Sequence, residues 1–231
     1  MSKLFPVAIL AGGLARRLRP MTEHMPKALL PIAGEPFIAH QLQLLRKNNI
    51  EKVVLCVGYL GEQIRDYVGD GSRFGLHVDY VFDGPKLLGT GGAIKQALPV
   101  LGETFFILYG DSYLPCDYLA VQHAFEASRQ LALMTVFRNK GLWDASNIEF
   151  HDGNILVYDK KHRTDRMQYI DYGLSVTMSS VFQAASYQSD LADVYQLLLQ
   201  QHQLAGFEIN QRFYEVGSFT GIQEFTQYLQ Q

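Results

Sequence analysis

Apolar runs and amphipathic segments alternate along the first 137 residues of the chain. The apolar runs are typical of buried strands, and we expect strands at residues 7–10, 52–57, 76–82, 104–109 and 131–137. The segments between them repeat apolar residues at helical spacing, which predicts helices at residues 35–48, 61–68, 91–101 and 115–128. This alternation predicts an α/β fold, with a mostly parallel sheet covered by helices on both faces.

The pattern changes after residue 137. Residues 146–150 and 154–159 flank Asp152-Gly153, a turn signal that predicts an antiparallel hairpin. Further strands are expected at residues 169–179, 207–209 and 213–216, and further helices at residues 190–203 and 219–229. We therefore expect a single domain, residues 1–231, in which a parallel half (1–137) is followed by a half that carries a small antiparallel insert (138–231).

A glycine pair and four cations follow the first strand. Gly12 and Gly13 end the apolar run. The basic residues of the span that follows are Arg16, Arg17, Arg19 and Lys27. Glycine lets backbone N–H groups approach oxyanions, and arginine and lysine neutralise them, so this stretch is a candidate polyphosphate site. A glycine turn followed by a solvated basic face is the alternative interpretation.

The composition narrows the choice of ligand. The 231 residues are 48% hydrophobic and carry a formal net charge of -3, so the chain can bury a core but has no global basic field for binding nucleic acid. Cys56 and Cys116 are too few for a disulfide framework or a zinc site, and we expect buried thiols. No apolar run has the length of a signal peptide or a bilayer span, which favours a cytoplasmic protein without a membrane partner.

Three motifs occur in order along the chain. Residues 10–36 read LAGGLARRLRPMTEHMPKALLPIAGEP, residues 88–93 read LGTGGA, and residues 109–111 read YGD. The first resembles the signature LAGGxGxRLxPxTxxxPKxLxPxxGxP of the sugar-1-phosphate nucleotidyltransferases, or nucleoside-diphosphate-sugar pyrophosphorylases. The second resembles the base-binding loop of that family, and the third its metal-binding aspartate. The resemblance covers essentially the whole chain and implies a Rossmann-like mixed sheet, with the nucleotide bound mainly by the first half and the sugar phosphate mainly by the second.

The resemblance implies that a sugar-phosphate oxygen attacks the α-phosphorus of a nucleoside triphosphate and releases pyrophosphate. Two anions must meet, so charge neutralisation is the central problem. Arg17 and Lys27 match the signature cations and are the expected catalytic residues, together with Asp111. By the same resemblance Asp111 is also the expected Mg²⁺ ligand, and its place after a buried strand is where open α/β sheets bind ligands; a helix N-cap before Pro115 is the weaker alternative. Glu215 replaces the aspartate of a D-x-G-[ST] element and is the expected second ligand; a solvent-facing strand residue is the alternative.

The resemblance also implies two sets of binding residues. The implied nucleotide-binding residues are Leu10, Ala11, Gly12, Gly13, Asp83, Gly89, Thr90 and Gly91. Of these, Asp83 has two equally good interpretations, since its carboxylate can accept hydrogen bonds from a guanine edge or cap the turn before Gly84-Pro85. The implied sugar-phosphate-binding residues are Asn147, Asp159, Lys160, Asp171 and Gly173.

Several of these positions leave alternatives or depart from the family pattern. Lys161 is a less favoured substitute for Lys160, and Asn147 also fits a buried polar turn. Asp171 stands where the family usually has asparagine. Ala15 stands where the family usually has glycine, which is acceptable if its φ is negative. Arg16 replaces a small hydroxyl residue and offers another cation near the phosphates.

The expected function is therefore Mg²⁺-dependent joining of a nucleoside triphosphate to a sugar 1-phosphate by a monomer or homodimer. The loop at residues 88–94 looks most like heptose- or mannose-1-phosphate guanylyltransferases, which favours GTP. A uridylyltransferase acting on a hexose or amino-sugar 1-phosphate is one alternative. A cytidylyltransferase acting on a non-sugar phosphate such as phosphocholine is another. A non-catalytic nucleotide-binding regulator is the third, supported by Glu215, Ala15 and Arg16.

Overall fold

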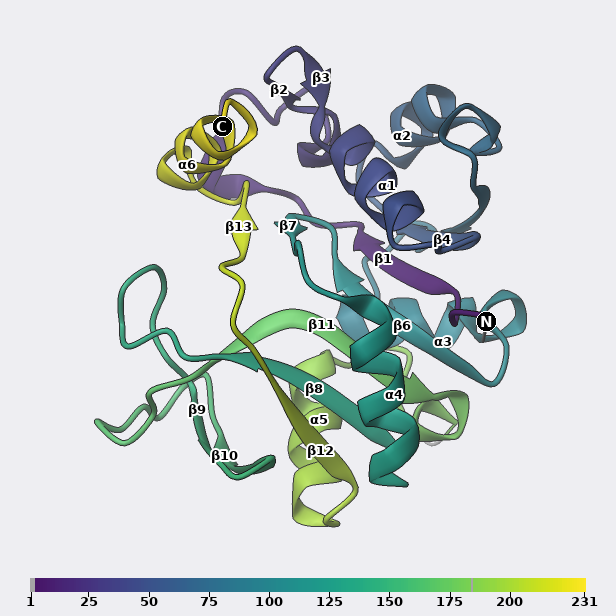
Figure 1. The fold of residues 1–231 in the computed structure, drawn as a ribbon. Coiled ribbons are helices and arrows are strands. Elements are labelled where there is room, and N and C mark those ends of the chain that lie inside the picture. Colours follow the sequence, from purple (N-terminus) through teal and green to yellow (C-terminus); the bar gives the residue numbers. More distant parts are fainter. Residues whose placement is uncertain (1–2, 184) are drawn as a thin grey trace.

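A mixed sheet runs through the centre of the molecule (Figure 1). In the computed structural model, which describes residues 3–183 and 185–231, this sheet has seven strands in the order β12-β8-β11-β6-β1-β4-β5. Their bounds are β1 (Val7–Ala11), β4 (Lys52–Val57), β5 (His77–Phe82), β6 (Thr104–Tyr109), β8 (Ala132–Phe137), β11 (Ile170–Met178) and β12 (Leu204–Ile209). Only β11 runs antiparallel to its neighbours among these strands, so the expected mostly parallel sheet is confirmed.

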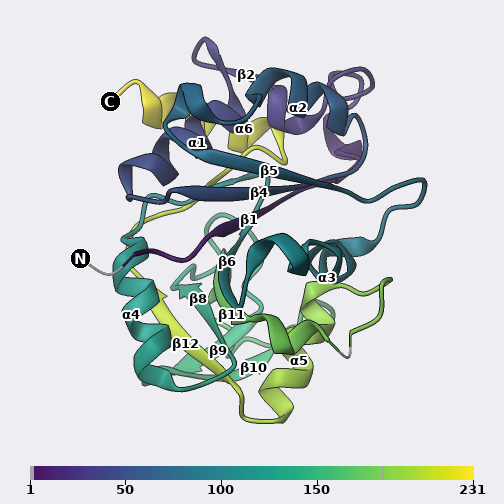
Figure 2. The ribbon, with the colours of Figure 1, turned by 90° about the vertical axis from the view of Figure 1, so that its right-hand side faces the viewer.

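Helices cover both faces of the sheet, as the alternating pattern predicts (Figure 2). One face packs against α1 (Phe37–Lys47), α2 (Gly61–Val68) and α4 (Tyr118–Ser128), and the other against α3 (Gly89–Leu101) and α5 (Leu191–Gln200). Successive residues of a strand point to opposite faces. In β1, Val7 and Ile9 therefore join the first core, whereas Ala8 joins the second. Strands buried on both sides explain why their sequences are continuously apolar rather than alternating.

Three small sheets and a last helix complete the fold. The small sheets pair β9 (Ile148–His151) with β10 (Asn154–Tyr158), β7 (Ser112–Tyr113) with β13 (Tyr214–Glu215), and β2 (Pro31–Ile32) with β3 (Glu35–Pro36). The short 3-10 helices are η1 (Arg16–Leu18), η2 (Lys27–Leu29), η3 (Ser72–Phe74) and η4 (Ser179–Phe182). The last helix, α6 (Phe219–Leu229), packs through Phe225 on Phe37 at the start of α1. This packing holds β13 next to β7.

The differences from the sequence-based prediction lie at element ends and in the shortest strands. α4 begins at Tyr118 rather than residue 115, because the Asp117 carboxylate caps the helix by accepting from the Ala120 backbone N–H at 3.1 Å. β12 begins at Leu204, earlier than the expected residue 207, because it pairs in parallel with β8 from Ala132 onward. β13 lies within the strand expected at residues 213–216, whereas β2, β3 and β7 were not expected, since strands of two residues leave no periodic signal.

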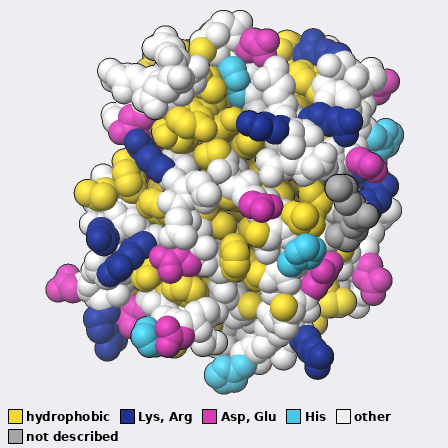
Figure 3. All heavy atoms as spheres, viewed as in Figure 1, with side chains coloured by type: hydrophobic (Ala, Val, Ile, Leu, Met, Phe, Trp, Pro, Cys, Tyr) yellow, Lys and Arg dark blue, Asp and Glu magenta, His cyan; other side chains and the backbone are white. Residues whose placement is uncertain are grey.

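The remaining general expectations concern cysteines, charge and membranes. Cys56 and Cys116 are both buried free thiols, as expected, and burial raises the pKa of each to about 12. Basic and acidic side chains are interspersed on the face drawn in Figure 3 rather than gathered into one basic patch. Within residues 3–183 and 185–231, no helix has the length and apolar character needed to cross a bilayer.

Candidate active site

The site lies where β1 and β6 end side by side. β1 has β4 on one side and β6 on the other, and all three strands run in the same direction. In open α/β sheets, ligands bind at the carboxyl ends of the strands, at the point where the chain continues to one side of a strand and later returns to its other side. β1 is such a strand here, because β4 lies on one side of it and β6 on the other. The chain approaches itself closely here, because a Cβ on Gly110 would collide with the Leu10 carbonyl oxygen. Glycine at residue 110 therefore brings Asp111 next to the turn that follows β1.

A cavity of about 260 Å³ opens at these strand ends. We call it the first cavity. Seven of the eight expected nucleotide-binding residues line it, namely Leu10, Ala11, Gly12, Gly13, Asp83, Gly89 and Thr90. Gly91 does not line the cavity, and its backbone N–H donates to the Ser189 carbonyl at 2.8 Å. The cavity also contains two of the expected catalytic residues, Lys27 and Asp111, and among its further lining residues are Cys56, Leu87 and Asp190.

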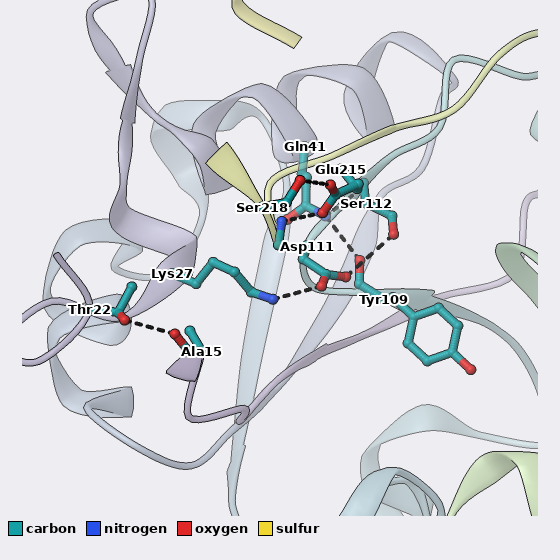
Figure 4. Close-up of polar contacts among 10 residues, drawn as sticks. Ala15, Thr22, Lys27, Gln41, Tyr109, Asp111, Ser112, Glu215 and Ser218 are labelled. Carbon is teal, nitrogen blue, oxygen red and sulfur yellow. Dashed lines mark hydrogen bonds and ion pairs between the residues drawn. The ribbon is translucent and has the colours of Figure 1, made fainter. Parts of the chain in front are cut away.

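The turn after β1 corrects one expectation. Ala15 has φ 47° and ψ 40°, in the left-handed region, so the condition of a negative φ, under which alanine would be acceptable at this position, is not met. The Ala15 carbonyl group fixes the turn, because it accepts from the buried Thr22 hydroxyl at 2.9 Å (Figure 4) and from the Leu18 backbone N–H at 3.1 Å. The need for a positive φ gives a physical reason for the glycine that the family usually has at this position.

Lys27 and Asp111 form the central ion pair of the site (Figure 4). Lys27 begins η2, and its Nζ lies 2.6 Å from Asp111 Oδ2. The two side chains are 21% and 34% exposed, so both remain accessible to a ligand. A lysine that already neutralises one carboxylate at the end of β6 is positioned to meet a second anion at the same place.

The turn that carries Asp111 is held from two sides. From α1, the Gln41 Nε2 donates to the carbonyl oxygens of Tyr109 and Ser112, at 3.3 and 2.7 Å (Figure 4). From the other side, the Val216 backbone N–H donates to the Asp111 carbonyl at 2.9 Å. Gln41 is buried, so its amide is committed to this turn. It was missed in the sequence, where the available signal is one polar residue within the apolar stripe of a helix.

Glu215 lies next to Asp111 because β13 pairs with β7, with Glu215 opposite Ser112. Its carboxylate accepts from the Gly217 backbone N–H and from the Ser218 hydroxyl. A Cβ on Gly217 would lie 2.7 Å from Glu215 Oε2 and 3.3 Å from Asp111 Oδ2. Glycine thus leaves open a small space that both carboxylates face, and Mg²⁺ is commonly held by one or two carboxylates together with phosphate oxygens and water. These residues fit the ion, although the described residues include no cluster of three or more metal-binding side chains.

A second cavity, of about 440 Å³, adjoins the first. Tyr109 and Asp111 line both cavities. The second cavity is also lined by Glu215, by two expected sugar-phosphate residues, Asp171 and Gly173, and by Arg17. Arg17 is exposed on η1 and borders this cavity rather than the first. Arg17 therefore borders the same cavity as Asp111 and Glu215, whereas Lys27 lines the first cavity and pairs with Asp111.

Asp171 has the most unusual environment of the expected residues. Its side chain is only 7% exposed, Oδ1 accepts from the Gly173 backbone N–H at 3.0 Å, and Oδ2 has no hydrogen-bond partner among the described residues. Lys160 is the nearby cation, with Nζ 3.9 Å from Oδ2. Burial raises the pKa of Asp171, and the charge of Lys160 opposes that rise.

Asn147 and Asp159 have structural partners and line neither cavity. The Asn147 Oδ1 accepts from the Asp171 backbone N–H at 3.2 Å, and its carbonyl accepts from the Asp159 backbone N–H at 3.0 Å. The Asp159 Oδ1 accepts from the backbone N–H groups of Lys161 and His162, at 2.7 and 2.9 Å. Both residues therefore hold the segments that carry Lys160 and Asp171.

Asp83 has features of both of its interpretations. It lines the first cavity, and burial raises its pKa. The nearby Leu88 backbone N–H, in the loop between β5 and α3, opposes that rise in pKa. Its Oδ2 would lie 3.0 Å from a Cβ on Gly58. The Asp83 side chain therefore lies close to the loop between β5 and α3 and also faces the first cavity.

Trp143 and Arg212, which were not expected, form one wall of the second cavity. The Arg212 guanidinium lies 4.5 Å from the centre of the Trp143 ring and 4.9 Å from that of Tyr214. It also forms an ion pair with Glu224 of α6. No spacing in the sequence indicates these contacts, because the residues come from three separate segments.

The fold and the paired cavities define the chain as an α/β protein whose glycine turn and carboxylates suit a phosphorylated ligand. A nucleotidyl transferase family profile matches residues 7–231, so the chain belongs to that family. This confirms the resemblance noted in the sequence.

Three relatives illustrate the match. The N-acetylmuramate alpha-1-phosphate uridylyltransferase of Neisseria meningitidis is 39% identical over 124 residues, which are 53% of this chain and 52% of that protein, so the aligned stretch spans about half of the relative's length. The D-glycero-alpha-D-manno-heptose 1-phosphate guanylyltransferase of Aneurinibacillus thermoaerophilus is 28% identical, over 90% of this chain and 91% of that protein. The crystal structure of HddC from Yersinia pseudotuberculosis complexed with GMP-PN superimposes with a TM-score of 0.81 at 21% identity, over 98% of this chain and 100% of that chain. That likeness shows the same fold and confirms the Rossmann-like class.

Proposed function

We propose that the protein transfers a nucleotidyl group from a nucleoside triphosphate, with GTP favoured, to a sugar 1-phosphate and releases pyrophosphate. The observation that carries this proposal is the position of Asp111, which lies in the walls of two adjoining cavities and is paired with Lys27. The first cavity offers a glycine turn and backbone amides to a nucleotide. The second offers Arg17, Asp171 and Gly173 to an acceptor.

The proposed reaction forms one phosphorus–oxygen bond and breaks another. An oxygen of the sugar phosphate attacks the α-phosphorus, and the bond from the α-phosphorus to the bridging oxygen breaks, so that pyrophosphate leaves with the electron pair. Lys27 would stabilise the charge at the α-phosphate, since its ammonium group already lies at the boundary of the two cavities. The backbone N–H groups after β1 would hold the phosphates, and Arg17 would bind an anionic oxygen on the acceptor side.

Asp111 and Glu215 would hold a Mg²⁺ ion in the space beside Gly217. When bound, the ion would neutralise phosphate charge at the junction of the cavities. The role of the protein is to keep the two carboxylates together. The β7–β13 pairing does this for the backbone, and the Ser218 hydroxyl does it for the Glu215 side chain.

The acceptor would lie against Asp171 and Gly173, with Lys160, which lines neither cavity, 3.9 Å from Asp171 Oδ2. The unpartnered Oδ2 of Asp171 suits sugar hydroxyls, because a buried acceptor without a donor gains most from a ligand that supplies one. Lys160 would bind the phosphate or neutralise Asp171, and Asn147 and Asp159 would act by holding these two residues in place.

The heptose guanylyltransferase relative, which aligns over 90% of this chain, supports GTP. The structural neighbour bound to GMP-PN is consistent with that choice. A uridylyltransferase is the second candidate, favoured by the 39% identity to the Neisseria enzyme over 124 residues. A nucleoside triphosphate substrate would place the reaction in the cytoplasm, and the chain would act as a monomer or homodimer.

Pyrophosphate release tests the proposal directly. The four nucleoside triphosphates are combined with a panel of hexose, amino-sugar and heptose 1-phosphates, with phosphocholine as a non-sugar acceptor, and with and without Mg²⁺. We expect turnover with GTP and one class of sugar 1-phosphate, Mg²⁺ dependence, and loss of turnover in Asp111→Asn. Asp66→Asn on the exposed face of α2 is the matched control and should keep full activity. Nucleotide binding without turnover of any pair would contradict the proposal and favour a regulatory protein.

A further inference from the structure

Asp190 carries a free carboxylate on the wall of the first cavity. Its Oδ1 lies 3.3 Å from the position that a Cβ on Gly89 would occupy, at the start of α3. Asp190 is the residue before α5, where an aspartate normally caps the helix, yet its side chain makes no capping hydrogen bond. Among the described residues it forms no ion pair either. The carboxylate is therefore available to a ligand in the cavity.

The backbone around Asp190 is fixed to the glycine loop at the start of α3. The Ser189 carbonyl accepts from the Gly91 and Gly92 backbone N–H groups, at 2.8 and 3.2 Å. The Leu191 backbone N–H donates to Thr90 Oγ1 at 2.7 Å, so the first N–H group of α5 is satisfied by the loop at the start of α3. α3 and α5 also lie side by side (Figure 2). Asp190 thus keeps a constant position relative to the loop that would bind the base.

The charges in the cavity set the direction in which a nucleotide would lie. The glycine turn and Lys27 are at the end formed by β1 and β6, and Asp190 is beside Gly89 and Thr90. Asp111 and Asp83 also line the cavity, and Asp83 Oδ2 lies 3.2 Å from the position of a Cβ on Gly12, so the carboxylates by themselves do not set this direction. Lys27 is the one cation among the described lining residues, and the backbone N–H groups after β1 lie at the same end, so phosphates would lie there and the base would face Asp190. An ionised carboxylate can accept hydrogen bonds but cannot donate them, so it selects a base edge that donates.

We propose that Asp190 selects guanine by accepting hydrogen bonds from its N1–H and 2-amino groups, an inference that rests on the proposed nucleotide site. These two donors are adjacent, so they match the two carboxylate oxygens in a bidentate, charge-assisted pair. Uracil and thymine present one N–H between two carbonyl oxygens, which a carboxylate repels. Adenine and cytosine present one amino group next to a ring nitrogen that also accepts. Asp190 therefore discriminates against all four of these bases.

Calorimetric titration with nucleotides tests this inference without any acceptor. GTP, ITP and UTP are titrated with Mg²⁺ into the wild-type protein, Asp190→Asn, Asp190→Ala and the control Asp193→Asn. ITP lacks only the 2-amino group of guanine, so the ratio of GTP to ITP affinity reports one of the two hydrogen bonds. Asp193 is exposed in the first turn of α5 and does not line the cavity, which makes it a matched loss of charge.

We expect the wild-type protein and Asp193→Asn to bind GTP about tenfold or more tightly than ITP, because hydrogen bonds to charged groups are the strong ones. Asp190→Ala should bring the ratio close to one, and Asp190→Asn should weaken GTP binding more than UTP binding. A wild-type preference for UTP, or a GTP to ITP ratio that Asp190→Ala leaves unchanged, would overturn the inference. Failure of the proposed function has a different result, namely no pyrophosphate release with any pair, while this binding ratio remains measurable.

Discussion

Ala15 stores conformational energy that a single substitution should release. It has φ 47°, on the turn between Gly13 and η1, and two hydrogen bonds to its carbonyl hold it there. An L-residue with a Cβ pays about 1–2 kcal/mol in this left-handed conformation, and glycine does not. We therefore expect Ala15→Gly to stabilise the folded protein.

The size of the gain follows from two opposing effects. Glycine makes the unfolded chain more flexible, which lowers stability by about 0.4–1 kcal/mol. The net change in the free energy of unfolding should be a gain of about 0.5–1 kcal/mol. For a chain of this length, that corresponds to a rise in Tm of roughly 1–4 °C.

Urea and thermal unfolding, followed by circular dichroism, measure this change. Ala127→Gly is the control, because Ala127 is exposed within α4, where the same substitution should lower stability by roughly 0.5–1 kcal/mol. The two identical substitutions should therefore change Tm in opposite directions. An Ala15→Gly protein that melts at or below the wild-type Tm, while Ala127→Gly falls as expected, would refute the reasoning.

Three further predictions concern the site. Lys27→Ala and Asp111→Asn should each lower turnover more than a hundredfold, measured by pyrophosphate release, with the circular dichroism spectrum unchanged; near-normal turnover would remove that residue from the mechanism. Gln41→Ala should lower kcat roughly tenfold through the loosened turn after β6, with a smaller change in the KM for the nucleotide; an unchanged kcat would show that the turn holds without it. Asp171→Asn should raise Tm more at pH 8 than at pH 4. Because the pKa of Asp171 is higher in the folded protein than in the unfolded chain, the free energy of unfolding falls as the pH rises between these two values. Asparagine does not ionise, so the variant does not lose stability in this way. A Tm difference that does not change with pH would contradict a raised pKa.

The main elements were predictable because burial leaves a periodic signal. β4 and β6 are apolar at almost every residue, since both of their faces are covered, and the expected bounds match the structure. The signal fails where an element is too short to repeat. β7 has two residues and was not predicted, whereas β13 lies within the strand expected at residues 213–216; their pairing is held by side-chain packing from a distant helix.

The site residues were predictable where a glycine or a charged residue ends an apolar run. Gly12 directly follows β1, and Asp111 follows β6 after Gly110, so their place at one edge of the sheet followed from the parallel order. Asp190 gave no such signal, because an aspartate before a helix is an ordinary cap. Its place in the cavity depends on contacts between distant parts of the chain, because Ser189 and Leu191 on either side of it are hydrogen-bonded to the loop at the start of α3.

The pairing of β7 with β13 has a consequence for the order in which the protein folds. Asp111 and Glu215 are far apart in sequence, and contacts of that kind form late because the intervening chain must first be ordered. Most of the first cavity is built from residues before 112, which reach their places through local strand–helix units. A nascent or partly folded chain would therefore form most of its nucleotide cavity before it has a second carboxylate. Catalysis would begin only when the last strand closes, so an incompletely folded molecule would bind nucleotide without consuming it.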